Sequence, residues 1–229
     1  MKNKKIIIGS RGSKLALKYA EKAKSELLKT KNIEDIEIKS ITTKGDSVQN
    51  IRLSEYGGKG LFCKTIEEEL INKKIDIAVH ALKDMPTDET KELITNCFLE
   101  RNDPREILIS GNKKKLKELN SKAIIGTSSY RREYQIKNIR PDINCKLIRG
   151  NIDTRLKKLK KGMYDAIILS YAGIKYLNLE NEISQIFSTE EIIPSTGQGI
   201  IALQCREDDQ EIISILNKIN HPETYKRAH

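Results

Sequence analysis

The sequence lacks tryptophan and has only three phenylalanines among its 229 residues. Proteins that bind single-stranded nucleic acids usually offer aromatic side chains on which bases stack. This scarcity argues against nucleic-acid binding, although the formal net charge is +10. A basic protein also attracts anionic membranes and small ligands rich in carboxylates, so the net charge alone does not identify the anion.

Long apolar runs are also missing. No run approaches the roughly 18 residues of a transmembrane helix. The basic start of the chain is followed by only three isoleucines, Ile6–Ile8. A secretory signal needs about 7–15 apolar residues at that place. The sequence therefore predicts a cytoplasmic protein.

The cysteines do not have the spacing of a metal site. None belongs to a CxxC pair, and most lie in apolar runs: Cys63, Cys97, Cys145 and Cys205. Paired spacing is the usual signal of zinc binding or redox chemistry. We therefore expect buried free thiols and no metal.

Strand-like and helix-like apolar patterns alternate along the chain in two series. Strands are expected at 6–9, 36–42, 75–82, 123–127, 145–148 and 165–169, and helices at 14–28, 61–72, 130–139 and 152–160. Such alternation predicts an α/β fold with parallel sheets and helices on both faces.

The two series begin alike, with a strand, a glycine, hydroxyl side chains and a helix. This repetition predicts two similar α/β lobes, with ligand bound in a cleft at the carboxyl ends of their strands. Pattern breaks near Pro104 and at 194–199 predict the boundaries. We expect a first lobe at 1–100 and 200–219, including a returning strand at 200–205, and a second lobe at 101–199.

Basic residues follow three of the expected strands. In Gly9–Ser13, Arg11 offers a forked donor for a carboxylate at a helix N-terminus, a place that favours anions. The alternative is that Ser13 only caps the helix. In Gly126–Arg132, two arginines in the first helical turn oppose the helix dipole. A bound anion would compensate for that conflict, although a solvated basic turn is the alternative.

The third basic segment is Arg149–Arg155. Arg149 ends a strand and Arg155 lies about one turn into the next helix, so both can face one cleft. Lys83 and Asp84 follow an apolar strand and form a candidate catalytic pair, or an ordinary ion pair in a turn. The glycine-rich segment around Lys59 fits no nucleotide-binding motif. It is interpreted as the hinge of a lid or as a plain flexible loop.

Taken together, these segments resemble the porphobilinogen deaminase family over nearly the whole chain. The matching stretches are GSRGSKLAL, TTKGD, YGGKGLF, DIAVHALKDMPT, LERNDPRE, GTSSYRR, LIRGNIDTRL, the AG of LSYAG, and IPSTGQG. Each motif is weak alone, but their order and spacing are specific. The resemblance implies two doubly wound lobes similar to a type II periplasmic binding protein, followed in the family by a third, α+β domain.

The resemblance also implies the reaction. Family members condense four porphobilinogen molecules head to tail with loss of ammonia, giving hydroxymethylbilane, a precursor of haem. Each pyrrole ring carries an acetate and a propionate, which would explain a basic cleft. The implied enzyme is a monomeric transferase that acts on a small molecule, with no nucleic-acid or membrane partner.

Individual roles are implied by the residues that match the family's motifs. Asp84 matches the catalytic carboxylate, which stabilises the cation formed as ammonia leaves. Positions that hold substrate or cofactor are matched by Arg11, Ser13, Lys59, Lys83, Thr127, Ser128, Ser129, Arg131, Arg132, Arg149, Gly150, Arg155 and Gln198. Two departures, Ala81 in place of the usual serine and Tyr176 in place of a basic residue, put single contacts in doubt.

The family's cofactor is a dipyrromethane, bound through a thioether to a cysteine of the third domain. None of the four cysteines here matches that position, and 220–229 resembles the entry to that domain. We therefore expect the third domain to be absent and this 229-residue form to be inactive. Two other hypotheses remain: a two-lobed protein that binds a small anion without catalysis, and a nucleic-acid protein supported only by net charge.

Overall fold

The computed structural model describes residues 5–30, 33, 35–43, 45 and 58–228. The chain divides into two compact units. The first contains the described residues up to Asn102 and those from Ile200 onward, and the second runs from Asp103 to Gly199. Among the described residues, the second unit is therefore inserted into the first, and the chain passes between them twice.

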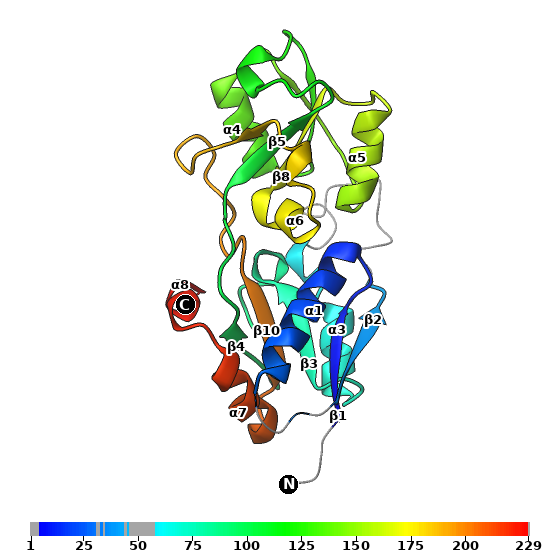
Figure 1. Ribbon diagram of the computed structural model, residues 1–229, viewed down its shortest axis with the longest axis vertical. Helices are drawn as coiled ribbons and strands as arrows, with labels where there is room; N and C mark the ends of the chain where they lie inside the picture. The colour runs from blue at the N-terminus through cyan, green and yellow to red at the C-terminus, as the bar shows by residue number, and fades with distance from the viewer. Residues whose placement is uncertain (1–4, 31–32, 34, 44, 46–57, 229) are drawn as a thin grey trace. The chain divides into compact units, whose positions relative to one another are not determined.

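The first unit contains a five-stranded sheet in the order β2-β1-β3-β10-β4 (Figure 1). Its strands are β1 (Lys5–Arg11), β2 (Asp35–Ile41), β3 (Ile77–Ala81), β4 (Leu93–Phe98) and β10 (Ile201–Arg206). Strand β1 pairs in parallel with both β2 and β3. Strand β10 is antiparallel to both of its neighbours and is buried along its whole length.

The helices of the first unit follow from apolar spacing. Their bounds are α1 (Lys14–Leu28), α3 (Lys64–Ile71), α7 (Gln210–Ile219) and α8 (Pro222–Ala228), with short 3-10 helices η2 (Gly58–Leu61) and η3 (Leu82–Asp84). Helix α1 buries Ala20, Ala23 and Leu27, which share one helical face. Helix α3 buries Ile66 and Leu70 in a cluster that includes Ala78 of β3. The bounds predicted for α1 are confirmed.

The second unit contains another five-stranded sheet, in the order β7-β6-β8-β5-β9. Its elements are β5 (Glu106–Ser110), η4 (Leu116–Glu118), β6 (Ile124–Gly126), α4 (Tyr130–Ile139), β7 (Asn144–Lys146), α5 (Ile152–Lys160), β8 (Ala166–Ser170), α6 (Tyr171–Tyr176), η5 (Glu180–Glu182) and β9 (Gln185–Ile186). Alternate residues of β5 enter different cores: Leu108 packs with Ile136 of α4, and Ile107 packs with Leu156 of α5. Helices therefore cover both faces of this sheet, as predicted (Figure 1).

The prediction of parallel sheets was wrong for one strand in each unit, which pairs in the antiparallel direction. Strand β10 runs antiparallel to β3, with Ile201 opposite Ala81, the last residue of β3. Strand β5 runs antiparallel to β8, with Glu106 opposite Ser170, the last residue of β8. The two segments that connect the units thus enter each sheet at the carboxyl ends of its parallel strands. A strand that starts at that edge must run the opposite way.

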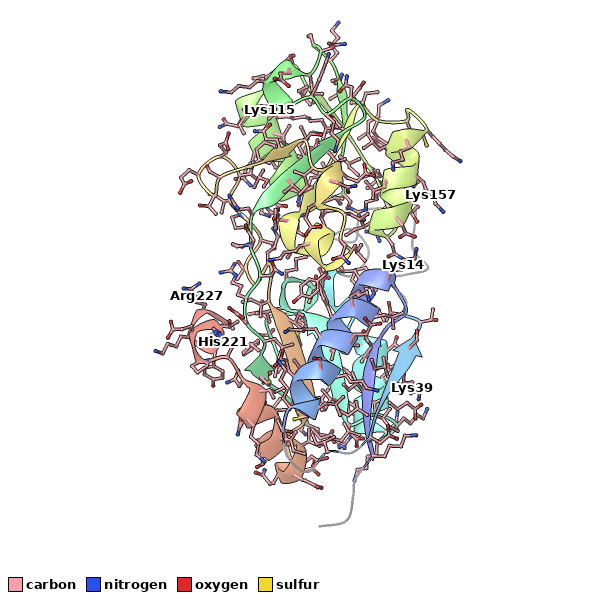
Figure 2. The ribbon with its side chains drawn as sticks, viewed as in Figure 1. Lys14, Lys39, Lys115, Lys157, His221 and Arg227 are labelled. Atoms are coloured by element: carbon pink, nitrogen blue, oxygen red, sulfur yellow. The ribbon has the colours of Figure 1, made fainter. Side chains whose placement is uncertain are left out.

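The segment 220–228 packs on the first unit. Asn220 accepts a hydrogen bond from the Phe98 backbone N–H through Oδ1 at 2.9 Å, and the His221 N–H donates to the Phe98 carbonyl at 2.9 Å. Thr224 accepts from the Arg101 N–H at 3.0 Å. These contacts fasten the start of α8 to the edge strand β4, and Figure 2 shows His221 and Arg227 on this terminal segment. The residues expected to open a further domain are thus tied to the first sheet.

Within the described part of the chain, no helix has the length and apolar character needed to cross a membrane.

Candidate functional site

In the first unit, the turn after β1 brings together an arginine and a helix cap. Ser13 is the N-cap of α1, and its Oγ accepts a hydrogen bond from the Ala16 N–H at 3.2 Å. Arg11 ends β1, and its guanidinium carbon lies 3.9 Å from the centre of the Phe62 ring. The capping alternative for Ser13 is therefore observed. The stacked Arg11 is partly exposed, so it remains a candidate for carboxylate binding.

Lys83 and Asp84 lie in η3, directly after the buried strand β3, and both side chains are half-buried. The Asp84 carbonyl accepts a weak hydrogen bond from the Cys63 thiol, with Sγ and O 3.7 Å apart. Burial raises the pKa of that thiol to about 12; the charges of Glu67 and Asp84 add to the shift, and Arg11 opposes it. Arg11 and Asp84 thus act on the same thiol, which places both side chains in one neighbourhood.

A buried polar cluster that sequence reasoning missed lies on β3, β10 and α3. The Gln204 amide donates to Glu67 Oε1 at 3.1 Å, and the Thr90 hydroxyl donates to Glu67 Oε2 at 2.9 Å. His80 adjoins this cluster. Burial lowers its pKa to about 4, the nearby side chain of Gln204 opposes the shift, and the charge of Arg11 adds to it. His80 is therefore neutral at pH 7. The sequence signal that could have revealed this cluster is the presence of polar residues inside otherwise apolar runs.

In the second unit, hydroxyl side chains shape the turn from β6 into α4. Thr127 is fully buried, and its Oγ1 accepts from the Ser129 N–H at 3.1 Å. Ser129 is the N-cap of α4 and accepts from the Arg132 N–H at 3.4 Å. Ser128 lies between them and is partly exposed. Thr127 and Ser129 thus use their oxygens within the turn, which fixes the start of α4.

The two arginines of this turn have an internal anionic partner, Glu106. Its carboxylate is fully buried at the start of β5. Arg132 donates from Nε to Glu106 Oε1 at 3.0 Å and from Nη1 to the Ile168 carbonyl at 3.1 Å. Arg131 donates to Glu106 and to the Ile193 carbonyl. The sequence pattern required an anion to offset two cations at a helix N-terminus, and a carboxylate of the chain itself provides it.

The electrostatics of Glu106 follow from this geometry. Burial alone raises the pKa of its carboxyl group, but the charges and hydrogen bonds of Arg132 and Arg131 outweigh burial, so the pKa is lowered. Burial lowers the pKa of Arg131, and Glu106 opposes that shift. Glu106 and Arg131 are therefore both charged at neutral pH.

The turn between β7 and α5 is held by basic side chains. Gly150 has a φ of +105°, and a Cβ placed there would lie 2.7 Å from Thr154 Cγ2. Arg155 donates from Nε to the Gly150 carbonyl at 2.8 Å, and Lys158 donates to the Arg149 carbonyl at 3.0 Å. Arg149 is 8% exposed. The positive φ and the closeness of Thr154 both require glycine here, so the structure explains Gly150 without any ligand.

Gln198 and Lys59 are the remaining predicted positions. Gln198 is fully buried and donates to the Pro104 carbonyl at 2.6 Å, so it links the two segments that connect the units. Lys59 belongs to η2, whereas Tyr56 and Gly57 of the same glycine-rich segment lie outside the described residues. Among the side chains that the structure describes, no group of three His, Cys, Asp or Glu could hold a metal ion.

Comparison with known proteins gives the family. Residues 6–214 match the family model described as "Porphobilinogen deaminase, dipyromethane cofactor binding domain". The chain belongs to the porphobilinogen deaminase family. The porphobilinogen deaminase of Lysinibacillus sphaericus is 44% identical over 227 residues, which cover 99% of this chain and 73% of that protein. The porphobilinogen deaminase of Bacillus cereus is 46% identical over 224 residues, covering 97% of this chain and 72% of that protein.

Solved structures confirm the fold class of two α/β lobes of the periplasmic-binding-protein type. A Bacillus subtilis protein described as a methionine-binding lipoprotein has a TM-score of 0.57 at 17% identity, covering 97% of this chain and 92% of that chain. A probable amino-acid ABC transporter extracellular-binding protein of Bacillus subtilis has a TM-score of 0.52 at 12% identity, covering 95% and 90%. At these identities the likeness concerns the fold alone.

The cofactor of the family is a dipyrromethane, and the residues of this chain fit it in one respect. Its acetate and propionate groups suit the arginines and lysines found at the strand ends. The thiols do not suit a thioether. Cys63, Cys97 and Cys205 are buried, and burial raises the pKa of each to about 12. Cys145 is partly buried on the edge strand β7. The chain's own residues therefore fit the carboxylates of the cofactor and not its covalent attachment.

Proposed function

We propose that Asp84 is the catalytic carboxylate for the condensation of porphobilinogen when the dipyrromethane of the family is bound. The observation that carries the proposal is the place of Asp84. It lies half-buried at the carboxyl end of β3, beside Lys83, and its charge and that of Arg11 have opposite effects on the pKa of the Cys63 thiol. A carboxylate at a strand end among cations suits the stabilisation of a cationic intermediate that is itself flanked by carboxylates.

The reaction of the family joins four porphobilinogen molecules head to tail and gives hydroxymethylbilane, a step of porphyrin and haem biosynthesis. The C–N bond of the protonated aminomethyl group breaks, its electron pair leaves with ammonia, and the pyrrole keeps the positive charge. A ring carbon of the neighbouring pyrrole forms a C–C bond with the methylene and loses its proton. Asp84 stabilises the cation and can accept the released proton.

Residues of each unit are proposed to bind the pyrrole carboxylates. In the first unit, Arg11 and Lys83 are the proposed partners, with Lys59 on the loop that precedes α3. In the second unit the proposed partners are Arg131, Arg132, Arg149 and Arg155, with the turn residues Thr127, Ser128, Ser129 and Gly150. Ser13 and Gln198 contribute by fixing the backbone, through the cap of α1 and the contact with Pro104.

The same side chains would hold the acetate and propionate groups of the dipyrromethane. When bound, that group supplies the pyrrole ring to which the first substrate is joined. Here the arginines orient the rings through forked hydrogen bonds, and Asp84 serves each condensation in turn.

We also propose that the chain acts as a monomer without a nucleic-acid partner. In each unit, the labelled lysines come from different elements: Lys14 and Lys39 in the first, and Lys115 and Lys157 in the second (Figure 2). Several lysines are paired with carboxylates, such as Lys39 with Glu69 at 2.6 Å. This dispersal supports a small-molecule ligand. DNA binding with a steep salt dependence would contradict it.

The substitution Asp84→Asn tests the function, because it keeps the size of the side chain and removes its charge. We expect a loss of turnover of about 100-fold or more, the usual cost of removing one group that stabilises charge in a transition state. Release of hydroxymethylbilane and ammonia from porphobilinogen provides the measurement. The exposed Asp88→Asn is the matched control, with turnover close to that of the unsubstituted chain.

Turnover of Asp84→Asn close to that of the control would remove Asp84 from catalysis. Tight binding of porphobilinogen without any turnover, even when the dipyrromethane is supplied, would favour the alternative of a small-anion binding protein.

A further inference from the structure

A buried carboxylate, Glu106, occupies the space between two arginines at the start of α4. It is fully buried, and it lies on β5, a different element from the helix that carries the arginines. Arg132 contacts both carboxylate oxygens, with Nε 3.0 Å from Oε1 and Nη2 2.8 Å from Oε2. Arg131 forms an ion pair with Oε1 at 2.5 Å. One carboxylate thus contacts both guanidinium groups.

The guanidinium groups of both arginines also donate hydrogen bonds to backbone carbonyls. Arg132 donates to the Ile168 carbonyl of β8, and Arg131 donates to the Ile193 carbonyl, which also accepts from Gln135 at 3.2 Å. The Gln135 side chain returns the contact by accepting from the Ile193 N–H at 2.7 Å. Each guanidinium is therefore held by Glu106 on one side and by a backbone carbonyl on the other.

The two arginines differ in how much of them a ligand can reach. The Arg131 side chain is 29% exposed, whereas that of Arg132 is 10% exposed. Together with Glu106 the pair has a net charge of +1. The exposed edge of the Arg131 guanidinium can therefore bind a ligand carboxylate, while its buried edge is held by Glu106, which Arg132 also contacts.

We propose that Glu106 is a positioning residue for carboxylate binding, which fixes the guanidinium groups of Arg131 and Arg132 before the ligand arrives. The proposal rests on the proposed function, in which these arginines bind the acetate or propionate of a pyrrole. A side chain that is ordered in advance loses less conformational entropy on binding. Without the carboxylate, two adjacent cations repel each other and leave this arrangement.

Glu106→Gln tests the role, because glutamine has the same length and no charge. The test is made in a chain that also carries Asp84→Ala, so that porphobilinogen is not consumed, and calorimetry measures the dissociation constant. We expect Glu106→Gln to raise this constant by about tenfold or more, since a misplaced group can cost up to about 100-fold. Glu106→Asp keeps the charge and restores most of the affinity.

Glu133→Gln is the matched control. Glu133 lies in the first turn of the same helix and pairs with Lys137 at 3.1 Å, so the substitution removes the same charge without touching either arginine's anchor. We expect its dissociation constant to stay within about twofold of the reference. Equal affinities for Glu106→Gln and Glu133→Gln would overturn the inference. An Asp84→Ala chain that does not bind porphobilinogen would instead overturn the proposed function.

If Glu106→Gln does not fold, the arginine side-chain N–H signals of the unsubstituted chain decide the matter by NMR. Ordered arginines give Nε–H signals of Arg131 and Arg132 that persist, with slow solvent exchange, before any porphobilinogen is added. Signals that appear only on addition of porphobilinogen would show that the ligand, and not Glu106, orders the pair.

Discussion

At the scale of single residues, His80 shows how burial controls a titratable group next to the proposed catalytic turn. The ring is 6% exposed on β3, in the strand that leads into Lys83 and Asp84. Burial lowers its pKa to about 4, below the ordinary value of 6.5, despite the opposing effect of the nearby Gln204 side chain. Between these two values the unfolded chain binds a proton that the folded chain excludes. His80 therefore makes stability increase with pH over this window.

The chain should consequently lose up to about 3 kcal/mol of unfolding free energy through His80 as the pH falls from 6.5 to 4. His80→Gln keeps a polar side chain that does not titrate, so its stability should fall less steeply over the same range. Urea unfolding of both proteins at pH 7, 6 and 5 measures the difference, and carboxylates common to both cancel. Parallel dependences in the two proteins would show that His80 is readily protonated in the folded chain.

Single residues also show how much of the candidate site could be predicted from the sequence. Arg131, Arg132 and Ser129 could be identified from the sequence, because a cap followed by two cations conflicts with the helix dipole in a visible way. Glu106 could not, since it lies 25 residues before Arg131 and the contact depends on the pairing of β5 with β8. Local patterns reveal that a partner is needed, whereas only the tertiary fold reveals which residue provides it.

At the scale of elements, Arg206 connects the end of α3 with the strands of the first sheet. Its Nη1 donates to the carbonyls of Leu70 and Ile75 at 2.9 and 2.8 Å. Its Nη2 contacts Asp76 at 3.3 Å and Asp209, the N-cap of α7, at 2.9 Å. One buried guanidinium thus satisfies the carboxyl end of a helix, the loop before β3 and the carboxylate that begins α7.

Arg206→Met should lower the free energy of unfolding by about 3 kcal/mol, because it leaves two half-buried carboxylates and two carbonyls without their cation. The matched control is Arg140→Met. Arg140 also binds an aspartate and backbone carbonyls, but it lies nearer to the surface, where water can replace it. We expect a cost of about 1 kcal/mol there. Denaturant unfolding compares them, and equal losses would contradict the connecting role of Arg206.

Strand direction was one part of the fold that the sequence did not predict, and strands β4 and β5 were not expected at all. The bounds of α1, α4 and α5 followed from apolar spacing and caps, and they are observed as expected. Strands β5 and β10 are rich in apolar residues, like the strands with which they pair. Their direction is set by where the chain enters each sheet, with Glu106 opposite Ser170 and Ile201 opposite Ala81. Periodicity reports burial of a strand and contains no information on its direction.

At the scale of the whole molecule, the described residues of the second unit form one continuous stretch, 103–199, and those of the first unit do not. Both cores of the second unit are built only from residues between Ile107 and Ile192. The first unit needs β10, which the chain reaches only after the second unit is complete, to fill the place between β3 and β4. The two units therefore differ in what they require to fold: one needs a single stretch of chain, and the other needs both of its halves.

We expect residues 103–199 to fold when produced alone, because 97 contiguous residues with two apolar clusters are enough for a small domain. The fragment 1–102, which has neither β10 nor α7, should not fold, since β3 and β4 would each lose a neighbouring strand. Joining 102 to 200 through a short glycine–serine linker should restore folding of the first unit. Circular dichroism and cooperative thermal melting of the three proteins measure these outcomes. Cooperative melting of 1–102 alone, or its absence in 103–199, would show that the units depend on each other differently.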